Sequence, residues 1–354
     1  MVRQWVALAL LVIATPGAAQ GPQERQLPAT EAYRHGPTGL AVPAALPDAP
    51  PRARVAILAP ELDEFVEYKT ADADQSITLY VFRRVSGTVP VWFDRAAQQI
   101  LQREVYGGPT PLGAAAAFTP PGQSSASGLI QVFRVAKPPY RSTGVALLPL
   151  GDDWFVKLRY SSTTIAPEDL GAKMQAVLAA IEWPKQIAPV PAAMPIADCT
   201  TALAAKDGAK PRANTLGATL LQSALLGAIA RKELKPTTVH IATYCRDTAP
   251  RPALANAGVY RADGARDGYL LALGDAGRGV SVTPDTLGAL AGDTNQKSYS
   301  ITLLNIGQSF VFAPRDRLPR PEQAFDIVKS ERPVSSLATW GGAHDIAIDA
   351  KAVR

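Results

Sequence analysis

The chain has 354 residues, of which 47% are hydrophobic and 19% are charged. This balance is typical of a globular protein with a packed core, and it excludes a chain that is disordered or of low complexity throughout. The formal net charge of +5 is small for this length, so we interpret it as solvated surface and expect no nucleic acid partner. The length favours about two domains.

Residues 1–19 have the layout of a secretory signal peptide. Arg3 supplies the basic start, residues 5–14 form an apolar run, and the small residue Ala19 precedes the expected cleavage before Gln20. The apolar run is shorter than the roughly 20 residues that a membrane-spanning helix needs. We therefore expect an exported protein, periplasmic or secreted, without a transmembrane anchor once the signal is removed.

The first folded module is predicted to follow a leader. Residues 20–52 are rich in proline and alanine without sustained periodicity, which is typical of a disordered segment. Within residues 53–184, the stretch 76–85 alternates as a strand does, Asp94 is placed to cap one helix, and Pro167 opens another. This pattern predicts a sandwich of one sheet covered by two helices.

The second module is predicted to follow a linker. Residues 185–197 are rich in proline, which is typical of a stiff connection. Residues 198–335 then contain an apolar helix, a series of short strands and a helix that opens at Pro321, and residues 336–354 form a tail. The predicted fold class is α+β: two small modules, each an antiparallel sheet packed with amphipathic helices.

The two cysteines of the chain, Cys199 and Cys245, are predicted to form a disulfide. Cysteines of an exported protein meet an oxidising compartment, where pairing is the default. The disulfide would close a long loop and stabilise the second module.

Residues 237–245 contain His240 and Cys245, a pair that could suggest a nucleophile with its base or two metal ligands. In a strand, however, an odd spacing turns the two side chains to opposite faces of the sheet. We therefore interpret His240 as a surface histidine. Neither His35 in the leader nor His344 in the tail belongs to a zinc-binding spacing. We expect no catalytic residue, no metal and no cofactor.

Three arginines near the start of the last helix, Arg315, Arg317 and Arg320, form a candidate anion-binding group. Guanidinium groups suit phosphate and carboxylate because they donate paired hydrogen bonds. If the fold also brings Arg246 and Arg251 close, an anion-binding surface results. The same stretch offers acidic residues that can instead neutralise the arginines, namely Asp316, Glu322 and Glu331.

The end of the first module resembles a known fold. A hairpin that ends in WFVKLRYSS leads into a helix that ends at EWP, and this arrangement is similar to the closing strands and helix of Mog1/PsbP-like α/β/α modules. We assign this resemblance to residues 53–184. It implies a binding or assembly role more often than catalysis. It transfers no site residue, because fold similarity alone does not assign a function.

The sequence therefore favours an exported, non-enzymatic binding or assembly protein of the cell envelope, whose partner is an envelope protein or an anionic envelope polymer. Two alternatives stay open. One is an envelope hydrolase that uses His240 with residues recruited from other elements. The other is a periplasmic binder of small molecules, which requires an apolar cavity between sheet and helices.

Overall fold

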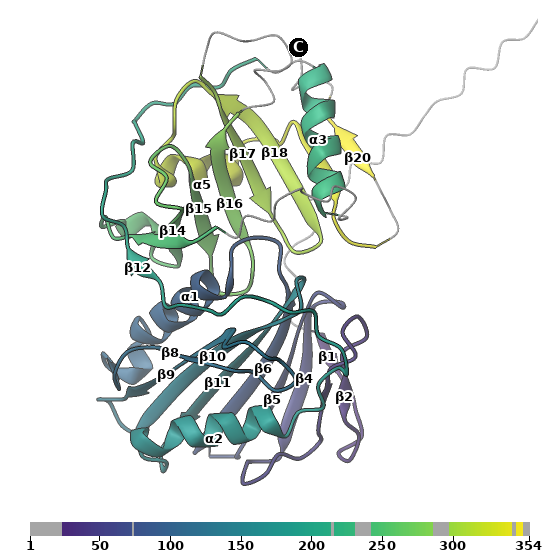
Figure 1. Ribbon diagram of the computed structural model, residues 1–354, viewed down its shortest axis with the longest axis vertical. Coiled ribbons are helices and arrows are strands. Elements are labelled where there is room, and N and C mark those ends of the chain that lie inside the picture. The colour runs from purple at the N-terminus through teal and green to yellow at the C-terminus, as the bar shows by residue number, and fades with distance from the viewer. Residues whose placement is uncertain are drawn as a thin grey trace, which may run out of the picture.

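The computed structural model describes residues 23–72, 74–213, 216–230, 242–285, 297–341 and 345–349. Within these residues the chain forms two sheet-rich bodies stacked on one another (Figure 1). The structure is 37% strand and 18% helix. The prediction of two helix-packed α+β modules is therefore wrong, because sheet dominates both bodies.

The first body is built on an antiparallel sheet with the strand order β1-β4-β5-β6-β11-β10-β9-β7, and β8 also pairs with β9. Its strands are β1 (Gln23–Arg25), β4 (Arg52–Ala59), β5 (Asp63–Lys69), β6 (Gln75–Arg83), β7 (Thr110–Pro111), β8 (Ala116–Phe118), β9 (Gly128–Arg134), β10 (Ser142–Leu150) and β11 (Trp154–Ser162).

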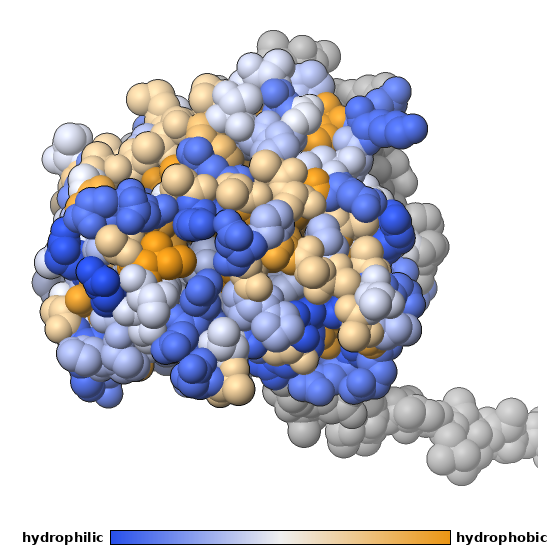
Figure 2. Space-filling view, turned by 90° about the horizontal axis from the view of Figure 1, so that it is seen from below, coloured by the Kyte–Doolittle hydropathy of each residue, from blue (hydrophilic) through white to orange (hydrophobic). Residues whose placement is uncertain are grey.

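Both faces of this sheet are covered by a helix. On β6, Ile77 and Leu79 belong to the hydrophobic core under α2 (Pro167–Ala179), whereas Phe82 belongs to the core under α1 (Val89–Leu101). The strand is therefore buried on both sides, with Ile77, Leu79 and Val81 on one face and Tyr80 and Phe82 on the other. Figure 2 shows the end of the molecule that this body forms, where hydrophilic residues surround smaller hydrophobic spots.

The helix α1 begins at Val89 rather than at the predicted cap, Asp94. Pro90 suits the first turn, where the missing N–H of proline is not needed. Asp94 instead lies inside the helix and is buried, so its carboxylate serves a tertiary contact. A 3₁₀ turn at η1 (Glu104–Tyr106) follows the helix.

The described part of the predicted leader, residues 23–52, is folded rather than disordered. Strand β1 pairs with β4, and β2 (Tyr33–Arg34) pairs with β3 (Ala41–Val42). Tyr33 and Leu40 are fully buried in the core that α2 also covers. These apolar residues follow neither a helical nor a strand period, because tertiary packing rather than regular structure buries them.

The second body is built on a sheet with the strand order β12 to β20, in which β12 and β13 are parallel and the other pairs are antiparallel. Its strands are β12 (Ala197–Asp198), β13 (Tyr244–Asp247), β14 (Ala257–Ala262), β15 (Tyr269–Leu273), β16 (Gly279–Pro284), β17 (Tyr299–Leu304), β18 (Gln308–Arg315), β19 (Ser335–Ala338) and β20 (Ile346–Ile348).

Among its described residues, the second body also contains the helices α3 (Leu216–Ala230) and α5 (Pro321–Ser330) and the 3₁₀ turn η2 (Pro252–Leu254). Helix α5 packs on one face of the second sheet through Ala324 and Ile327. Helix α3 lies against β19 and β20 (Figure 1). Residues predicted as a tail thus supply β20 and most of β19. Such short strands show too little alternation to be recognised from sequence.

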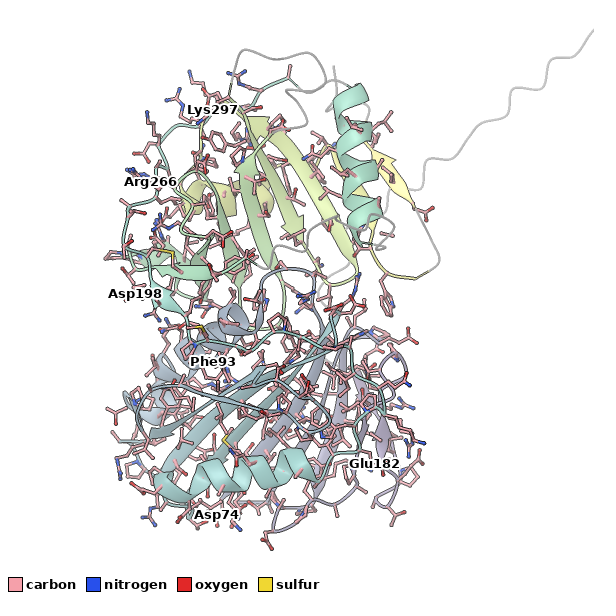
Figure 3. All side chains as sticks on the ribbon, in the orientation of Figure 1. Asp74, Phe93, Glu182, Asp198, Arg266 and Lys297 are labelled. Atoms are coloured by element: carbon pink, nitrogen blue, oxygen red, sulfur yellow. A yellow bond between two sulfur atoms is a disulfide. The ribbon has the colours of Figure 1, made fainter. Side chains whose placement is uncertain are left out.

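The two bodies share one hydrophobic core. Trp92 on α1 and Phe155 on β11 pack in the same cluster as Tyr260 and Leu270 of the second sheet. Phe93, also on α1, lies at the boundary of the two bodies (Figure 3). The predicted linker is docked as well, because Ala193 is buried in this cluster and its backbone N–H donates to the Ala126 carbonyl at 2.9 Å. The bodies are therefore joined by packing and not only by the chain.

Buried ion pairs across the boundary fix the relative orientation of the two bodies. Lys157 on β11 is buried, and its Nζ lies 2.9 Å from Oδ2 of Asp275, in the turn between β15 and β16. Arg159 reaches the same oxygen at 2.6 Å. Burial alone would raise the pKa of the Asp275 carboxyl, but the two cations hold this pKa well below its usual range. The turn of the second sheet is thereby fixed on the first.

Two further contacts cross the boundary beside this turn. Arg278 Nη1 lies 3.1 Å from Oδ2 of the buried Asp63, and burial nevertheless raises the pKa of that carboxyl. Arg83 donates to the Ile306 carbonyl at 2.8 Å. Since charged groups bury only when they are paired, these contacts favour one relative orientation of the two sheets.

We expect the substitution Asp275→Ala to lower the free energy of unfolding by about 3 to 5 kcal/mol, because it leaves Lys157 buried without its carboxylate. Urea denaturation followed by tryptophan fluorescence measures this. The control is Glu182→Ala, which breaks the exposed pair with Arg34 at 3.2 Å and should cost less than about 1 kcal/mol. Equal effects of the two substitutions would contradict a stabilising role for the buried pair.

Candidate binding pocket beside the disulfide

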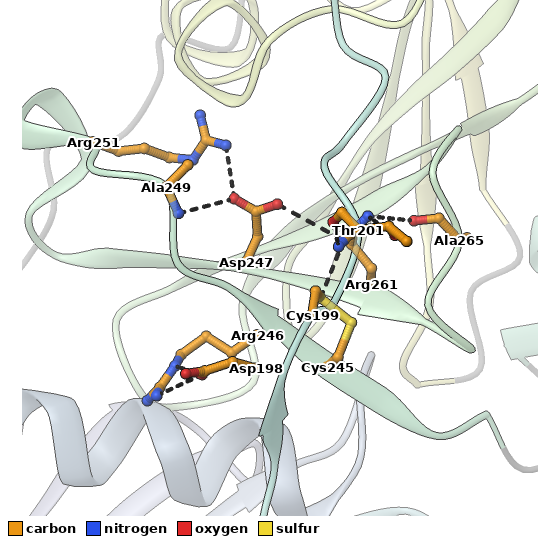
Figure 4. The surroundings of a disulfide bond; sticks show 10 residues. All are labelled: Asp198, Cys199, Thr201, Cys245, Arg246, Asp247, Ala249, Arg251, Arg261 and Ala265. Carbon is orange, nitrogen blue, oxygen red and sulfur yellow. Dashed lines mark hydrogen bonds and ion pairs between the residues drawn. A yellow bond between two sulfur atoms is a disulfide. The ribbon is translucent and has the colours of Figure 1, made fainter.

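Cys199 and Cys245 form a disulfide, as the sequence predicts, with a Cα–Cα distance of 4.9 Å (Figure 4). Cys199 directly follows β12, and Cys245 lies in β13, whose parallel pairing sets Ala197 opposite Cys245. The disulfide therefore fastens the extended segment 199–205 to the edge of the second sheet. It is compatible with an oxidising compartment outside the cytoplasm.

A pocket of about 750 Å³ opens beside this disulfide. Three stretches form its wall: the segment after β12, the loop after β13 and the first turn of α5. The volume falls in the range of small-molecule sites, roughly 300–1,000 Å³. The lining residues are Cys199, Thr200, Thr201, Ala202, Leu203, Ala205, Asp247, Thr248, Ala249, Pro250, Arg251, Arg320, Pro321 and Glu322.

Alternating charges hold the wall together. Oδ1 of Asp247 accepts hydrogen bonds from Arg251 Nη2 at 3.0 Å and from the backbone N–H of Ala249 at 3.3 Å (Figure 4). Arg251 Nη1 donates to Glu322 Oε1 at 3.1 Å and so connects the loop to α5. The carboxylates and guanidinium groups compensate one another, which lets them stay ordered in a partly buried place.

Arg261 on β14 fixes the segment after β12 from behind. It is fully buried, and its Nε donates to Cys199 Sγ at 3.1 Å. Its terminal nitrogens donate to the Thr201 hydroxyl at 3.4 Å and to the Thr201 carbonyl, and its Nε lies 3.7 Å from Oδ2 of Asp247 (Figure 4). One buried guanidinium thus ties the disulfide, the segment and the acidic wall together.

The outer end of the segment after β12 is held by a second arginine. The backbone N–H of Ala204 donates to the Arg266 carbonyl at 2.8 Å, and Arg266 Nε donates to the Ala202 carbonyl at 3.3 Å. Figure 3 labels Asp198 and Arg266, which lie on the same side of the second body. The segment is therefore anchored at both ends, which preserves the shape of the pocket.

The start of helix α5 adds partial positive charge to the pocket wall, which Glu322 in the first turn offsets in part. Helix α5 begins there with Arg320 as its N-cap, and no side chain caps the first turn. The N-terminal end of a helix carries a partial positive charge. In addition, Nε of Arg251 is buried without a hydrogen-bond partner among the described residues.

Of the three predicted anion-binding arginines, Arg320 alone lines the pocket, where it is joined by Arg251. Arg315 is buried and binds the Glu331 carboxylate, and Arg317 pairs with Asp316 at 3.1 Å. The two therefore do not contribute to this wall. Arg246, which the sequence suggested as a neighbour of these arginines, does not line the pocket either. It pairs with Asp94 at 2.9 Å and with Asp198 at 2.7 Å.

Of the histidines, only His35 lies among the described residues. It is buried, its Nδ1 lies 2.8 Å from the Thr38 hydroxyl, and its Nε2 lies 3.0 Å from the Glu61 carbonyl. Burial lowers its pKa, and because both ring nitrogens have polar partners we interpret the ring as a structural group. His240 and His344 lie outside the described residues, and a hydrolase built on His240 stays a prediction.

The pocket differs from the apolar cavity expected of a small-molecule binder, because it lies at a sheet edge and its wall is charged. The sequence analysis named Arg251 as a possible neighbour of the arginine group, but it did not identify Asp247 and Arg261 as site residues. One signal was present: Asp198 precedes one half-cystine, and Arg246 and Asp247 follow the other. Charged residues beside a disulfide indicate a polar environment, but their partners depend on the fold.

A scan against protein-family models finds no matching family, and a search of curated proteins finds no match. Among the residues that the structure describes, no group of three or more histidine, cysteine or acidic side chains could hold a metal ion. None of the described helices has the length and apolar character required to cross a bilayer.

We expect the double substitution Cys199→Ser/Cys245→Ser to lower the free energy of unfolding by up to about 4 kcal/mol, the loop-closure value for a separation of 46 residues. Chemical denaturation with and without a thiol reductant measures this. Reductant should shift the midpoint of the wild type and leave the double variant unchanged. A wild-type midpoint that does not respond to reductant would contradict the expectation.

Proposed function

We propose that this chain is an exported, non-enzymatic binding protein of the cell envelope, and that its ligand occupies the pocket beside the disulfide. The signal-like first 19 residues support export, and a disulfide suits an oxidising compartment. The observation that carries the proposal is a concave, charged wall that is fixed in advance by the disulfide, Arg261 and Arg266.

Pre-organisation supports this use of the pocket. A binding site loses affinity when loops and side chains must be ordered on binding. Here the segment after β12 is held by a covalent bond and by hydrogen bonds from the buried Arg261, and Arg251 is held by Asp247 and Glu322. A ligand would therefore meet polar groups that already have fixed directions.

The first body fits a supporting role in the same proposal. Its sheet has α1 on one face and α2 on the other. As part of the proposal we carry over the resemblance of residues 53–184 to Mog1/PsbP-like modules, which rests on the sequence pattern. Such modules imply binding or assembly more often than catalysis. We propose that the first body forms the rigid base on which the pocket-bearing body is carried and, by analogy of fold alone, that it contacts an envelope partner.

We expect Ala202→Trp to abolish ligand binding, because Ala202 lines the pocket and an indole ring would fill part of it. The matched control is Ala204→Trp, an exposed position of the same segment outside the wall. Thermal unfolding is measured in the presence of fractionated small molecules from an envelope extract. A bound ligand should raise the melting temperature of the wild type and of the control by several degrees, and leave that of Ala202→Trp unchanged.

An active fraction that stabilises Ala202→Trp as much as the wild type would show that binding occurs elsewhere. That result would contradict the pocket as the ligand site. Both tryptophan variants are first compared without ligand, so that a general loss of stability is not mistaken for a loss of binding.

A further inference from the structure

Resting on the proposed function, we propose that the pocket recognises a small polar molecule through one carboxylate group, and that Arg320 holds this carboxylate. Three charged residues of the pocket wall form a network with Arg261, which is buried behind the wall and does not line the pocket. Arg251 and Arg261 are positive, Asp247 and Glu322 are negative, and the contacts between these four residues are mutual. This inner network is balanced and has no net charge to offer a ligand.

Arg320 stands apart from the balanced network. Its carboxylate partner is Asp207, whose Oδ1 lies 2.9 Å from Nε, and Asp207 does not line the pocket. The two side chains are 55% and 74% exposed. An ion pair as exposed as this contributes little, so a ligand can compete for the arginine. Among the described residues, no hydrogen bond engages its terminal nitrogens.

A single carboxylate suits this cation better than a group of higher charge. A guanidinium binds a carboxylate through two parallel hydrogen bonds. Arg320 is a single cation outside the balanced network, so it can compensate one negative charge, whereas a doubly charged phosphate would leave a second charge without a partner in the wall. The pocket therefore favours a ligand group of single negative charge.

The rest of the ligand should be polar and uncharged. Thr200 and Thr248 are exposed and line the pocket, so their hydroxyls can donate and accept hydrogen bonds. A positively charged group on the ligand would need a carboxylate of the wall as its partner. Both oxygens of Glu322 already accept hydrogen bonds from Arg251 Nη1, at 3.1 and 3.4 Å. The apolar part of the wall is formed by alanines, two prolines and one leucine, namely Ala202, Leu203, Ala205, Ala249, Pro250 and Pro321.

The test compares acids with neutral analogues of the same shape. Calorimetric titration at low salt is performed with a panel of N-acetylated dipeptides, each as the free acid and as the C-terminal amide. The wild type should bind the acids about tenfold more tightly than the amides, the effect of one hydrogen-bonded charge. Arg320→Gln should remove this preference. Arg317→Gln, which changes an exposed arginine outside the wall, should keep it.

Each outcome decides between the carboxylate inference and the proposed function. If wild type binds no acid more tightly than its amide, or if Arg320→Gln keeps the preference, the carboxylate inference is overturned. If Ala202→Trp still abolishes binding in that case, the pocket stays the ligand site and only the role of Arg320 is wrong. If acids bind equally well to Ala202→Trp, the pocket itself is the wrong site and both proposals fail.

Discussion

The contact on which the arrangement of this protein depends is the buried ion pair between Lys157 of the first sheet and Asp275 of the second. A lysine that is removed from water must meet its carboxylate at a defined distance and direction. Hydrophobic packing around α1 buries apolar surface but does not by itself fix the relative orientation of the two sheets, because the hydrophobic effect is non-directional. The ion pair fixes this orientation. The two sheets therefore form one unit. The proline-rich residues 185–197 do not act as a spacer between them, because Ala193 is buried in the shared core.

A buried charged group also fixes the backbone beside the disulfide. Arg261 is buried, and its donors are satisfied by Cys199, Thr201 and the carbonyl of Ala265. Because removing any of these partners would leave a buried charge unsatisfied, the segment after β12 has little freedom to move. Asp94 acts similarly between the bodies, since it accepts from Tyr260 at 2.6 Å and from Arg246. Buried charges thus shape both the boundary and the pocket.

The sequence predicted those features that depend on local pattern. Strands with long alternation, the start of α2 at Pro167 and the pairing of the two cysteines were recognisable. Features that depend on contacts distant in sequence were not. Asp94 looked like a helix cap because its buried partners lie on another sheet, and residues 23–52 looked disordered because their core contacts have no period. For Arg315 the sequence did offer Glu331 as a neutralising partner, but it did not show that the arginine is buried.

The central claim, that the two sheets unfold as one unit, is tested most directly by differential scanning calorimetry of the chain with its disulfide intact. Shared packing and buried pairs predict a single transition in which the calorimetric enthalpy equals the van't Hoff enthalpy. Two separate transitions, or a calorimetric enthalpy well above the van't Hoff value, would mean that the bodies unfold independently. That result would contradict the role assigned to Lys157 and Asp275.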